Sequence, residues 1–529
     1  MLKRVRPIVF WGPFLIMLTA VVSSFAMPEA FLETTTAINA WTLDRLSWLY
    51  SLATFAFVGT IAFVYFSPLG AIRIGGENAE PIMSRWNWFA IALCTTVAIG
   101  ILFWASAEPM YHVHSPPASS GIEPNSAEAK VFAMSTLYLH WAFTPYAIYT
   151  LPAIAFALAY YNLGKSYSLG GMLSVMFGRR TEGTGGQLID ALALWALVAG
   201  MAASLGTGLL TIAGGLSAIL GIETTSVVLG GVAIAIVGCF IASAVTGLMK
   251  GIRILSDLNT KFFFVLAAFA FVFGPTVWLL STAVDSLGVY LNTFVERSLF
   301  TGAVADDAWP QSWSNFYWAN WLAWAPITAL FLGRLGKGYT VREFIQTTML
   351  GPSLFAIVWM SIFGGLAIHS NDASDGALKA ALDSEGAESV IYALFEFLPL
   401  APVLIVLFVA LSFISFVTAS DSNCEAIASL CEERTADDAS PTSLPLKVIW
   451  GMMIGGIAWF MTAAADVDGI KMMSNLGGIP ALFIVLGAMF CLWRMASRVR
   501  DGRLLGADRV ESDAVGGAPE RAVAASSTE

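Results

Sequence analysis

The chain has 529 residues, of which 57% are hydrophobic and 12% are charged, and its mean hydropathy is +0.73. An average soluble domain has about twice that share of charged residues, so this composition excludes an ordinary soluble globular protein. The formal net charge of −10 argues against nucleic acid as a partner, because phosphate binding requires a basic face.

Apolar runs bounded by charged or turn residues recur along the chain, and each is long enough to cross a bilayer as a helix of about 20 residues. The sequence therefore predicts an all-α integral membrane protein with twelve transmembrane helices. The predicted spans are 8–28, 47–67, 87–108, 131–161, 188–215, 225–248, 258–283, 314–333, 345–369, 399–430, 445–464 and 475–495.

The distribution of basic residues predicts the orientation of these spans. Most Lys and Arg residues fall in loops on the side of the N-terminus. The opposite loops hold only Arg45, Lys130, Arg297, Lys379 and Lys471. The positive-inside rule then places both termini in the cytoplasm and predicts a multi-pass protein of the cell inner (plasma) membrane.

Some segments lie outside the spans. Residues 1–7 form a short cytoplasmic N-terminus, and 496–529 read as a disordered, acidic cytoplasmic tail. In the outer loop 284–313, Val284, Leu287 and Leu291 recur at near-helical spacing. This spacing predicts a helix along the outer membrane surface, and a packed loop segment fits it equally well.

The sequence shows little that is typical of an enzyme. The five cysteines have neither disulfide nor C-x-x-C spacing, and no Ser/His/Asp arrangement, phosphate loop or H-E-x-x-H motif is present. His112 and His114 flank Val113 in a predicted outer loop, without an evident Cys, Asp or Glu ligand set, so both are expected to be solvated. We therefore expect no catalytic residue, no cofactor and no transition-metal site. His140, inside the fourth span, is expected to gate or to bond a neighbouring helix.

The aromatic residues are more informative, since the chain has 18 tryptophans. In the fourth span, Trp141, Tyr146 and Tyr149 share an arc of about 140° on one helix, and in the eighth span three tryptophans share about 120°. The three in the eighth span are Trp318, Trp321 and Trp324. Two such faces at mid-membrane predict a cage for an organic cation, against the alternative of interfacial or core packing.

Two prolines support a transport role. Pro145 and Pro326 stand inside the fourth and eighth spans, where they are expected to interrupt the helix. Interrupted helices free backbone carbonyls and amides for ions or substrate, as is typical of secondary transporters.

Several motifs together resemble the betaine/choline/carnitine transporter family. They are F-Y-W-A-N-W-L-A-W-A-P and its continuation to T-V-R-E-F (316–344), F-W-A-S-A-E-P (103–109), L-H-W-x-x-x-P-Y-A-I-Y in the fourth span, and F-V-T-A-S-D-S (416–422). The resemblance implies a homotrimer. It also implies two leading helices (8–86) followed by a five-plus-five inverted repeat, helices 3 to 7 (87–283) and 8 to 12 (314–495).

The resemblance also implies which residues hold a trimethylammonium-type substrate. The family's aromatic substrate-binding positions correspond here to Trp141, Tyr146, Tyr149, Asn320, Trp321 and Trp324, with Trp318 and Trp104 as weaker candidates. Tyr146 and Asn320 stand where tryptophan is typical. Of the family's glycine-rich stretch in the third span, only Gly100 remains, which disfavours a substrate carboxylate. Trimethylamine is therefore the first candidate, with choline, glycine betaine and carnitine as alternatives.

The family's sodium-binding positions are compared with this sequence one residue at a time. One family sodium site maps onto Cys94, Val97, Thr418 and Ala419, with Ser420 adjacent. The positions of the other site read Leu197 and Met201, so that site is expected to be absent. Some family members have an arginine in place of a sodium ion, and at the corresponding position this sequence has Asn259. Coupling to at least one sodium ion is favoured, and Asp421 and Glu425 leave proton coupling open.

The sequence thus predicts a secondary transporter that imports a small methylated amine, with the lipid bilayer and two further copies of the chain as partners. A membrane-embedded enzyme would require paired ionisable groups or metal ligands in the membrane, which the sequence does not show. An osmosensor of this family would carry long charged extensions, whereas the tail here is short and acidic.

Overall fold

The computed structural model describes residues 5–96, 100–246, 249–433 and 442–500, and within them the chain is helical, with two isolated β-bridges and no strand. The first half contains α1 (Pro7–Ala26), α2 (Pro28–Phe66), η2 (Pro68–Ala71), α3 (Arg85–Thr96), α4 (Gly100–His114), η3 (Ala118–Ser120), α5 (Ala127–Trp141), α6 (Phe143–Ala157), η4 (Leu158–Asn162), α7 (Leu169–Phe177), η5 (Gly178–Thr181), α8 (Gly183–Leu220), α9 (Ser226–Thr246) and α10 (Met249–Phe273).

The second half begins at the next helix. It contains α11 (Thr276–Ser298), α12 (Trp309–Ser312), α13 (Ser314–Leu335), α14 (Val341–Ile345), η6 (Gln346–Leu350), α15 (Gly351–Ala373), α16 (Ala377–Glu385), α17 (Ser389–Phe395), α18 (Ala401–Cys431) and α19 (Leu444–Arg500). The protein is an all-α integral membrane protein, as the composition predicts.

The twelve predicted spans all fall on these helices. Eight described helices are long and apolar enough to cross a membrane, or nine when α10 and α11 are taken as one bent pair. Three further predicted spans do not meet that criterion of length and hydropathy by themselves. The third span is described only as the short α3 and α4, on either side of residues 97–99, which lie outside the described part. The eighth span (α13) is rich in tryptophan and asparagine. The long helix α19 contains two spans joined at Asp466 (φ 47°, ψ −130°).

Several predicted boundaries are wrong. The seventh span ends at Phe273 instead of residue 283, because Gly274 and Pro275 terminate α10, and the chain bends there by 105° into α11. The predicted outer helix is confirmed as a helix, but it begins at Thr276. The twelfth span begins directly after Asp466 instead of at residue 475.

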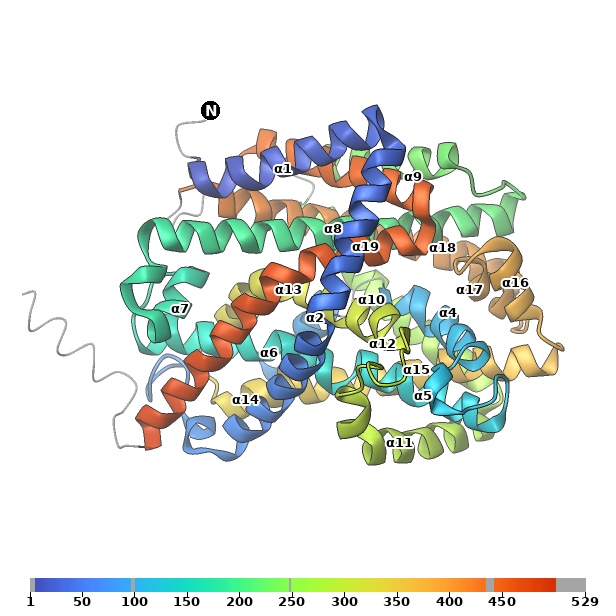
Figure 1. The fold of residues 1–529 in the computed structure, drawn as a ribbon, viewed down its shortest axis with the longest axis horizontal. Coiled ribbons are helices and arrows are strands. Elements are labelled where there is room, and N and C mark those ends of the chain that lie inside the picture. Colours follow the sequence, from blue (N-terminus) through green and yellow to red (C-terminus); the bar gives the residue numbers. More distant parts are fainter. Residues whose placement is uncertain (1–4, 97–99, 247–248, 434–441, 501–529) are drawn as a thin grey trace, which may run out of the picture.

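The helix α11 is attached to α5, and Figure 1 shows it at the lower edge of the molecule. Its exposed side carries apolar residues, of which Val284 and Leu291 are 69% and 59% exposed. At its end, Arg297 donates hydrogen bonds to the hydroxyls of Ser135 (2.6 Å) and Thr136 in α5. The guanidinium therefore links the end of α11 to α5.

The centre of the molecule is formed by α5, α6, α8, α13 and α19. Figure 1 shows α8 running across the molecule, with α19 and α13 near its middle. The helix α13 packs against α6, α8 and α19. Because α6 and α13 are in contact, the aromatic residues of the fourth and eighth spans meet although they are far apart in sequence.

The fourth span is broken, as Pro145 predicts. The helix stops at Trp141, Ala142 has non-helical angles (φ −107°, ψ −115°), and α6 starts at Phe143. A proline removes its own N–H and clashes with the carbonyl four residues earlier, here that of Trp141. The same expectation for Pro326 is wrong, because α13 continues through that residue as one helix.

Candidate functional site

Four aromatic side chains surround one another at the contact between the fourth and eighth spans. The ring of Trp321 lies 5.3 Å from that of Trp141, 6.1 Å from Tyr146 and 5.5 Å from Tyr149, measured between centroids. The interplanar angles are 81°, 50° and 71°. All four side chains are buried. We call these four residues the inner cage, and Trp321 is its hub.

This spacing suits a small organic cation. Two perpendicular rings that each lie about 4 Å from a shared cation have centroids about 5.7 Å apart, and cation–π attraction extends to about 6 Å. The inner-cage spacings fall around that value. Rings from three helices (α5, α6 and α13) therefore meet at Trp321, at the spacings of packed aromatic pairs.

The break in the fourth span helps to hold Trp321. Carbonyls in the last turn of a helix lack a partner within that helix. The carbonyl of His140 in that turn accepts a hydrogen bond from Nε1 of Trp321 over 3.1 Å. The loss of helical continuity at Ala142 is thus linked to the orientation of the hub tryptophan.

Gly100 permits a close approach to the cage. A Cβ at this position would lie 3.3 Å from Cη2 of Trp141, closer than an ordinary van der Waals contact. The one glycine that remains from the family's stretch is therefore the one that faces the first cage tryptophan.

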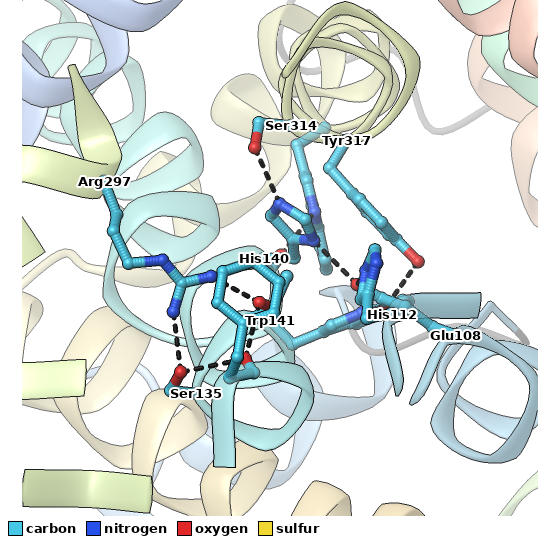
Figure 2. A network of polar contacts seen from close by, with 11 residues as sticks. Glu108, His112, Ser135, His140, Trp141, Arg297, Ser314 and Tyr317 are labelled. Carbon is cyan, nitrogen blue, oxygen red and sulfur yellow. Dashed lines mark hydrogen bonds and ion pairs between the residues drawn. The ribbon is translucent and has the colours of Figure 1, made fainter. Parts of the chain in front are cut away.

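A buried carboxylate lies beside Trp141 of the inner cage (Figure 2). Oε2 of Glu108 accepts hydrogen bonds from Nε1 of Trp141 (2.9 Å) and from the hydroxyl of Tyr317 (2.5 Å). Oε1 lies 2.7 Å from Nδ1 of His140 and 3.1 Å from Nε2 of His112. All five side chains are buried.

The arrangement identifies Glu108 as an ionised acceptor. A carboxylate offers about four lone-pair positions and no donor, and here four donor groups converge on it. His140 uses Nδ1 for Glu108, and its Nε2 lies 3.0 Å from Oγ of Ser314, which can donate. In the tautomers that carry one proton, on Nδ1 of His140 and on Nε2 of His112, both imidazoles are neutral, and the cluster then has a net negative charge next to Trp141.

The same three residues have metal-ligand chemistry, which the sequence argument did not anticipate. One ligand atom each from Glu108, His112 and His140 lies within 4.8 Å of the others. In the structure both imidazoles contact the carboxylate, whereas Nδ1 of His112 has no hydrogen-bond partner within the part of the chain that the structure describes.

The expectation of solvated loop histidines is wrong for His112. This residue is buried in the last turn of α4 and pairs with Glu108 four residues earlier, while half-buried His114 contacts Asn371 over 3.4 Å. The view that the membrane region lacks paired ionisable groups is corrected by the same pair. The spacing Glu108-x-x-x-His112, which puts both on one helix face, was the signal in the sequence.

Four predicted substrate residues lie outside the inner cage. Asn320 points to α19, where its Oδ1 accepts a hydrogen bond from Ser474 over 3.2 Å. Trp324 packs on α8, with Nε1 3.1 Å from where a Cβ of Gly200 would lie. Trp318 stacks edge-on with His140 at 5.7 Å.

Trp104 belongs to a different group of rings. It contacts Trp313, Phe316 and Tyr317 at 6.0, 5.7 and 6.0 Å between centroids. Tyr317, which sequence analysis did not select, links this group to the inner cage through Trp141 at 5.4 Å.

The predicted sodium residues are only partly described. Thr418 lies in α18, where its hydroxyl donates to the carbonyl of Ile414 over 2.8 Å, and Ser420 follows it in the same helix. Val97 and the side chains of Cys94 and Ala419 lie outside the described residues, as does the side chain of Asn259. Leu197 and Met201, at the second predicted position, are both buried in α8.

Comparison with known proteins shows the family to which the chain belongs. Residues 8–501 match BCCT, the betaine/carnitine/choline family transporter model. The chain is 30% identical over 502 residues to the glycine betaine transporter OpuD of Bacillus subtilis, covering 94% of this chain and 96% of OpuD. It is also 30% identical over 470 residues to the betaine/ectoine transporter LcoP of Corynebacterium glutamicum, covering 87% and 72%.

Among solved structures, a substrate-bound, outward-open Na⁺-coupled sialic acid symporter is similar at a TM-score of 0.43 and 15% identity, over 86% of each chain. No conclusion about fold or coupling rests on so low a score. The sequence match over nearly the whole chain and the full-length relatives do decide the family. The chain belongs to the betaine/carnitine/choline transporter family, and it is a membrane transporter and not an enzyme.

Proposed function

We propose that this protein is a secondary active transporter that imports a small methylated ammonium compound, with trimethylamine as the first candidate. The observation that carries this proposal is the contact between the inner cage and Glu108 through Trp141. The rings attract a cation through their faces. The buried carboxylate adds a negative charge on the same side.

The charge of the site distinguishes among methylated substrates. Trimethylammonium carries only a positive charge at neutral pH, because the pKa of trimethylamine is near 10, about that of other alkyl ammonium groups. A betaine or carnitine carboxylate would need a positive partner or free amides, and an unpaired buried carboxylate costs several kcal/mol. Glu108 would repel such a group, and Lys471, on the rings of Trp313 and Phe316, is the positive side chain with which it would have to pair.

The relatives are named for other substrates. OpuD is a glycine betaine transporter, LcoP a betaine/ectoine transporter, and a relative in Virgibacillus pantothenticus an ectoine/hydroxyectoine transporter. Glycine betaine, choline, carnitine and ectoine are therefore the alternatives. The order we expect is trimethylamine tighter than choline, and choline tighter than betaine or carnitine.

Sodium is the coupling ion that we propose. The support is the hydroxyl of Thr418 in α18, with Ser420 two residues later, at positions where the family resemblance implies a sodium site. The hydroxyl of Thr418 donates to its own helix and keeps its lone pairs available for a cation. Proton coupling through Asp421 or Glu425 is the alternative.

The assembly that we propose follows the family resemblance. It is a homotrimer with both termini in the cytoplasm, and each copy has two leading helices and two inverted repeats, 87–283 and 314–495. The exposed apolar side of α11 would be available for contacts with lipid or with another copy.

Calorimetric binding and uptake test the proposal together. Purified protein is titrated at pH 7 with trimethylamine, choline, betaine, carnitine and ectoine. Binding to purified protein is not affected by the leak of trimethylamine free base across membranes. Proteoliposomes then take up each radiolabelled compound with and without an inward sodium gradient. Tighter binding of betaine or carnitine than of trimethylamine would refute the substrate assignment, and sodium-independent uptake would refute the coupling.

A further inference from the structure

A second group of aromatic rings lies next to the inner cage. It consists of Trp104 and Tyr111 from α4, Trp313 at the start of α13, and Phe316 one turn later. The ring of Trp313 lies 6.0 Å from that of Trp104 and 5.0 Å from Tyr111, and Trp104 lies 5.7 Å from Phe316. We call these four residues the outer cluster, because the predicted topology places this end of both helices outside the cell.

The side-chain ammonium of Lys471 occupies the face of this cluster. Its Nζ lies 4.1 Å from the ring centroid of Trp313 and 5.9 Å from that of Phe316. Lys471 follows the break at Asp466 by five residues, so the second half of α19 positions it. The side chain is half-buried, and both distances are within the range of cation–π attraction, about 6 Å.

Other lysines of the protein are held differently. Lys130 pairs with Asp372 at 2.6 Å, and Lys379 pairs with Asp383 one helical turn away. Among the described residues, no carboxylate lies within 4.0 Å of Nζ of Lys471. The rings are therefore its close partners, which makes the outer cluster a site already filled by a primary ammonium ion.

Rings connect this site to the inner cage without interruption. Trp104 lies 6.0 Å from Tyr317, Tyr317 lies 5.4 Å from Trp141, and Trp141 lies 5.3 Å from Trp321. Both Tyr317 and Trp141 donate to Glu108. The outer cluster and the inner cage are therefore joined by ring contacts that lie beside one negative charge.

We propose that Lys471 is a tethered cation which occupies the outer cluster and which a bound ammonium substrate keeps displaced, because the two positive charges repel each other. This inference rests on the proposed function, since it requires a cationic substrate. A lysine ammonium is compact and strongly hydrated, so it can return to water when a methylated ammonium takes its place. The tether makes the exchange intramolecular, so Lys471 competes with substrate at every encounter.

Replacement of the lysine tests this competition. Lys471→Met keeps the length of the side chain and removes the charge, whereas Lys471→Arg keeps a cation that also stacks on aromatic rings. We expect Lys471→Met to lower the trimethylamine concentration for half-maximal binding about three- to ten-fold, with Lys471→Arg close to wild type. Lys379→Met is the matched control, since that lysine pairs with Asp383 and not with rings.

The outcomes separate the alternatives. Unchanged affinity in Lys471→Met would overturn the proposal. A weaker trimethylamine affinity would also overturn it. A loss of affinity confined to betaine, in the same titration of Lys471→Met, would instead assign Lys471 to attraction of a substrate's carboxylate. If the wild-type protein binds none of the methylated compounds, the proposed function fails together with this inference. If the wild-type protein binds them and Lys471→Met has the same affinity, only this inference fails.

A measurement on the wild-type chain avoids any question of variant folding. Brief acetic anhydride labelling followed by mass spectrometry reports how accessible each lysine amine is. Saturating trimethylamine should increase the labelling rate of Lys471 several-fold and leave Lys379 unchanged. Equal labelling of Lys471 with and without bound substrate would contradict displacement.

Discussion

Nε1 of Trp141 donates a hydrogen bond to Oε2 of Glu108 over 2.9 Å, so the first tryptophan of the inner cage and the buried carboxylate form one unit. The bond fixes the plane of the indole, because the ring can rotate only by losing a charge-assisted hydrogen bond. Tyr317 donates to the same oxygen from α13. The third, fourth and eighth spans are therefore connected at the place where a substrate cation is expected.

The hub of the inner cage should dominate substrate affinity. Trp321→Leu is expected to weaken trimethylamine binding by about 1–2 kcal/mol, roughly 5- to 30-fold, through loss of cation–π contact. Calorimetry on purified protein measures the change. Trp41→Leu is the control, since Trp41 is 61% exposed on α2. An unchanged affinity in Trp321→Leu, with unfolding temperature preserved, would remove the cage from the binding model.

The carboxylate behind the cage should contribute through its charge. Glu108→Gln keeps the shape of the side chain but removes the negative charge and replaces one acceptor with a donor amide. We expect trimethylamine binding to weaken by about 1–3 kcal/mol, the usual effect of disrupting a hydrogen bond to a charged group. Betaine binding should weaken less, because repulsion of its carboxylate is relieved. Exposed Glu128→Gln serves as the control, and equal losses for both ligands would argue for a purely structural role.

The sodium assignment depends on one hydroxyl. Thr418→Ala should raise the sodium concentration needed for half-maximal uptake, because an oxygen ligand is lost from the proposed site. Thr418→Ser retains the hydroxyl and should behave like wild type. Uptake in proteoliposomes across a series of sodium concentrations measures the effect. Sodium dependence that is the same in all three proteins would exclude Thr418 as a ligand.

An acidic side chain outside the spans should make stability depend on pH. Glu388, at the start of α17, is 4% exposed, and burial raises the pKa of its carboxyl to about 8, with nearby Asp466 and Glu385 adding repulsion. The folded state therefore favours the protonated form. Stability decreases as the pH rises from about 4.5, the ordinary value, to about 8, and is then constant.

Glu388→Gln should remove this dependence. At pH 9 the variant is expected to unfold at a temperature at least about 2 °C higher than wild type, and at pH 5 the two should be nearly equal. Thermal unfolding in detergent at both pH values measures the difference. Glu396→Gln, at an exposed position, should show no such pattern. A stabilisation of the same size at pH 5 would point to packing instead of charge.

Much of the architecture could be predicted from local sequence. Apolar length alone indicates the membrane helices, because a bilayer imposes that length on any crossing segment. The break at Pro145 is also a local effect, since proline acts on the turn that precedes it. Pro326 shows the limit of such rules, as packing of α13 between α6, α8 and α19 keeps that helix continuous.

The sequence by itself determined that this is a helical membrane transporter with aromatic residues on its fourth and eighth spans. Only the tertiary structure decided which of them share a site, because rings that recur on one helix face can contact different neighbours. Trp321 meets Trp141, Tyr146 and Tyr149, whereas Trp324 packs on α8. Glu108 acquires its role in the same way, since its donors come from three helices that only folding brings together.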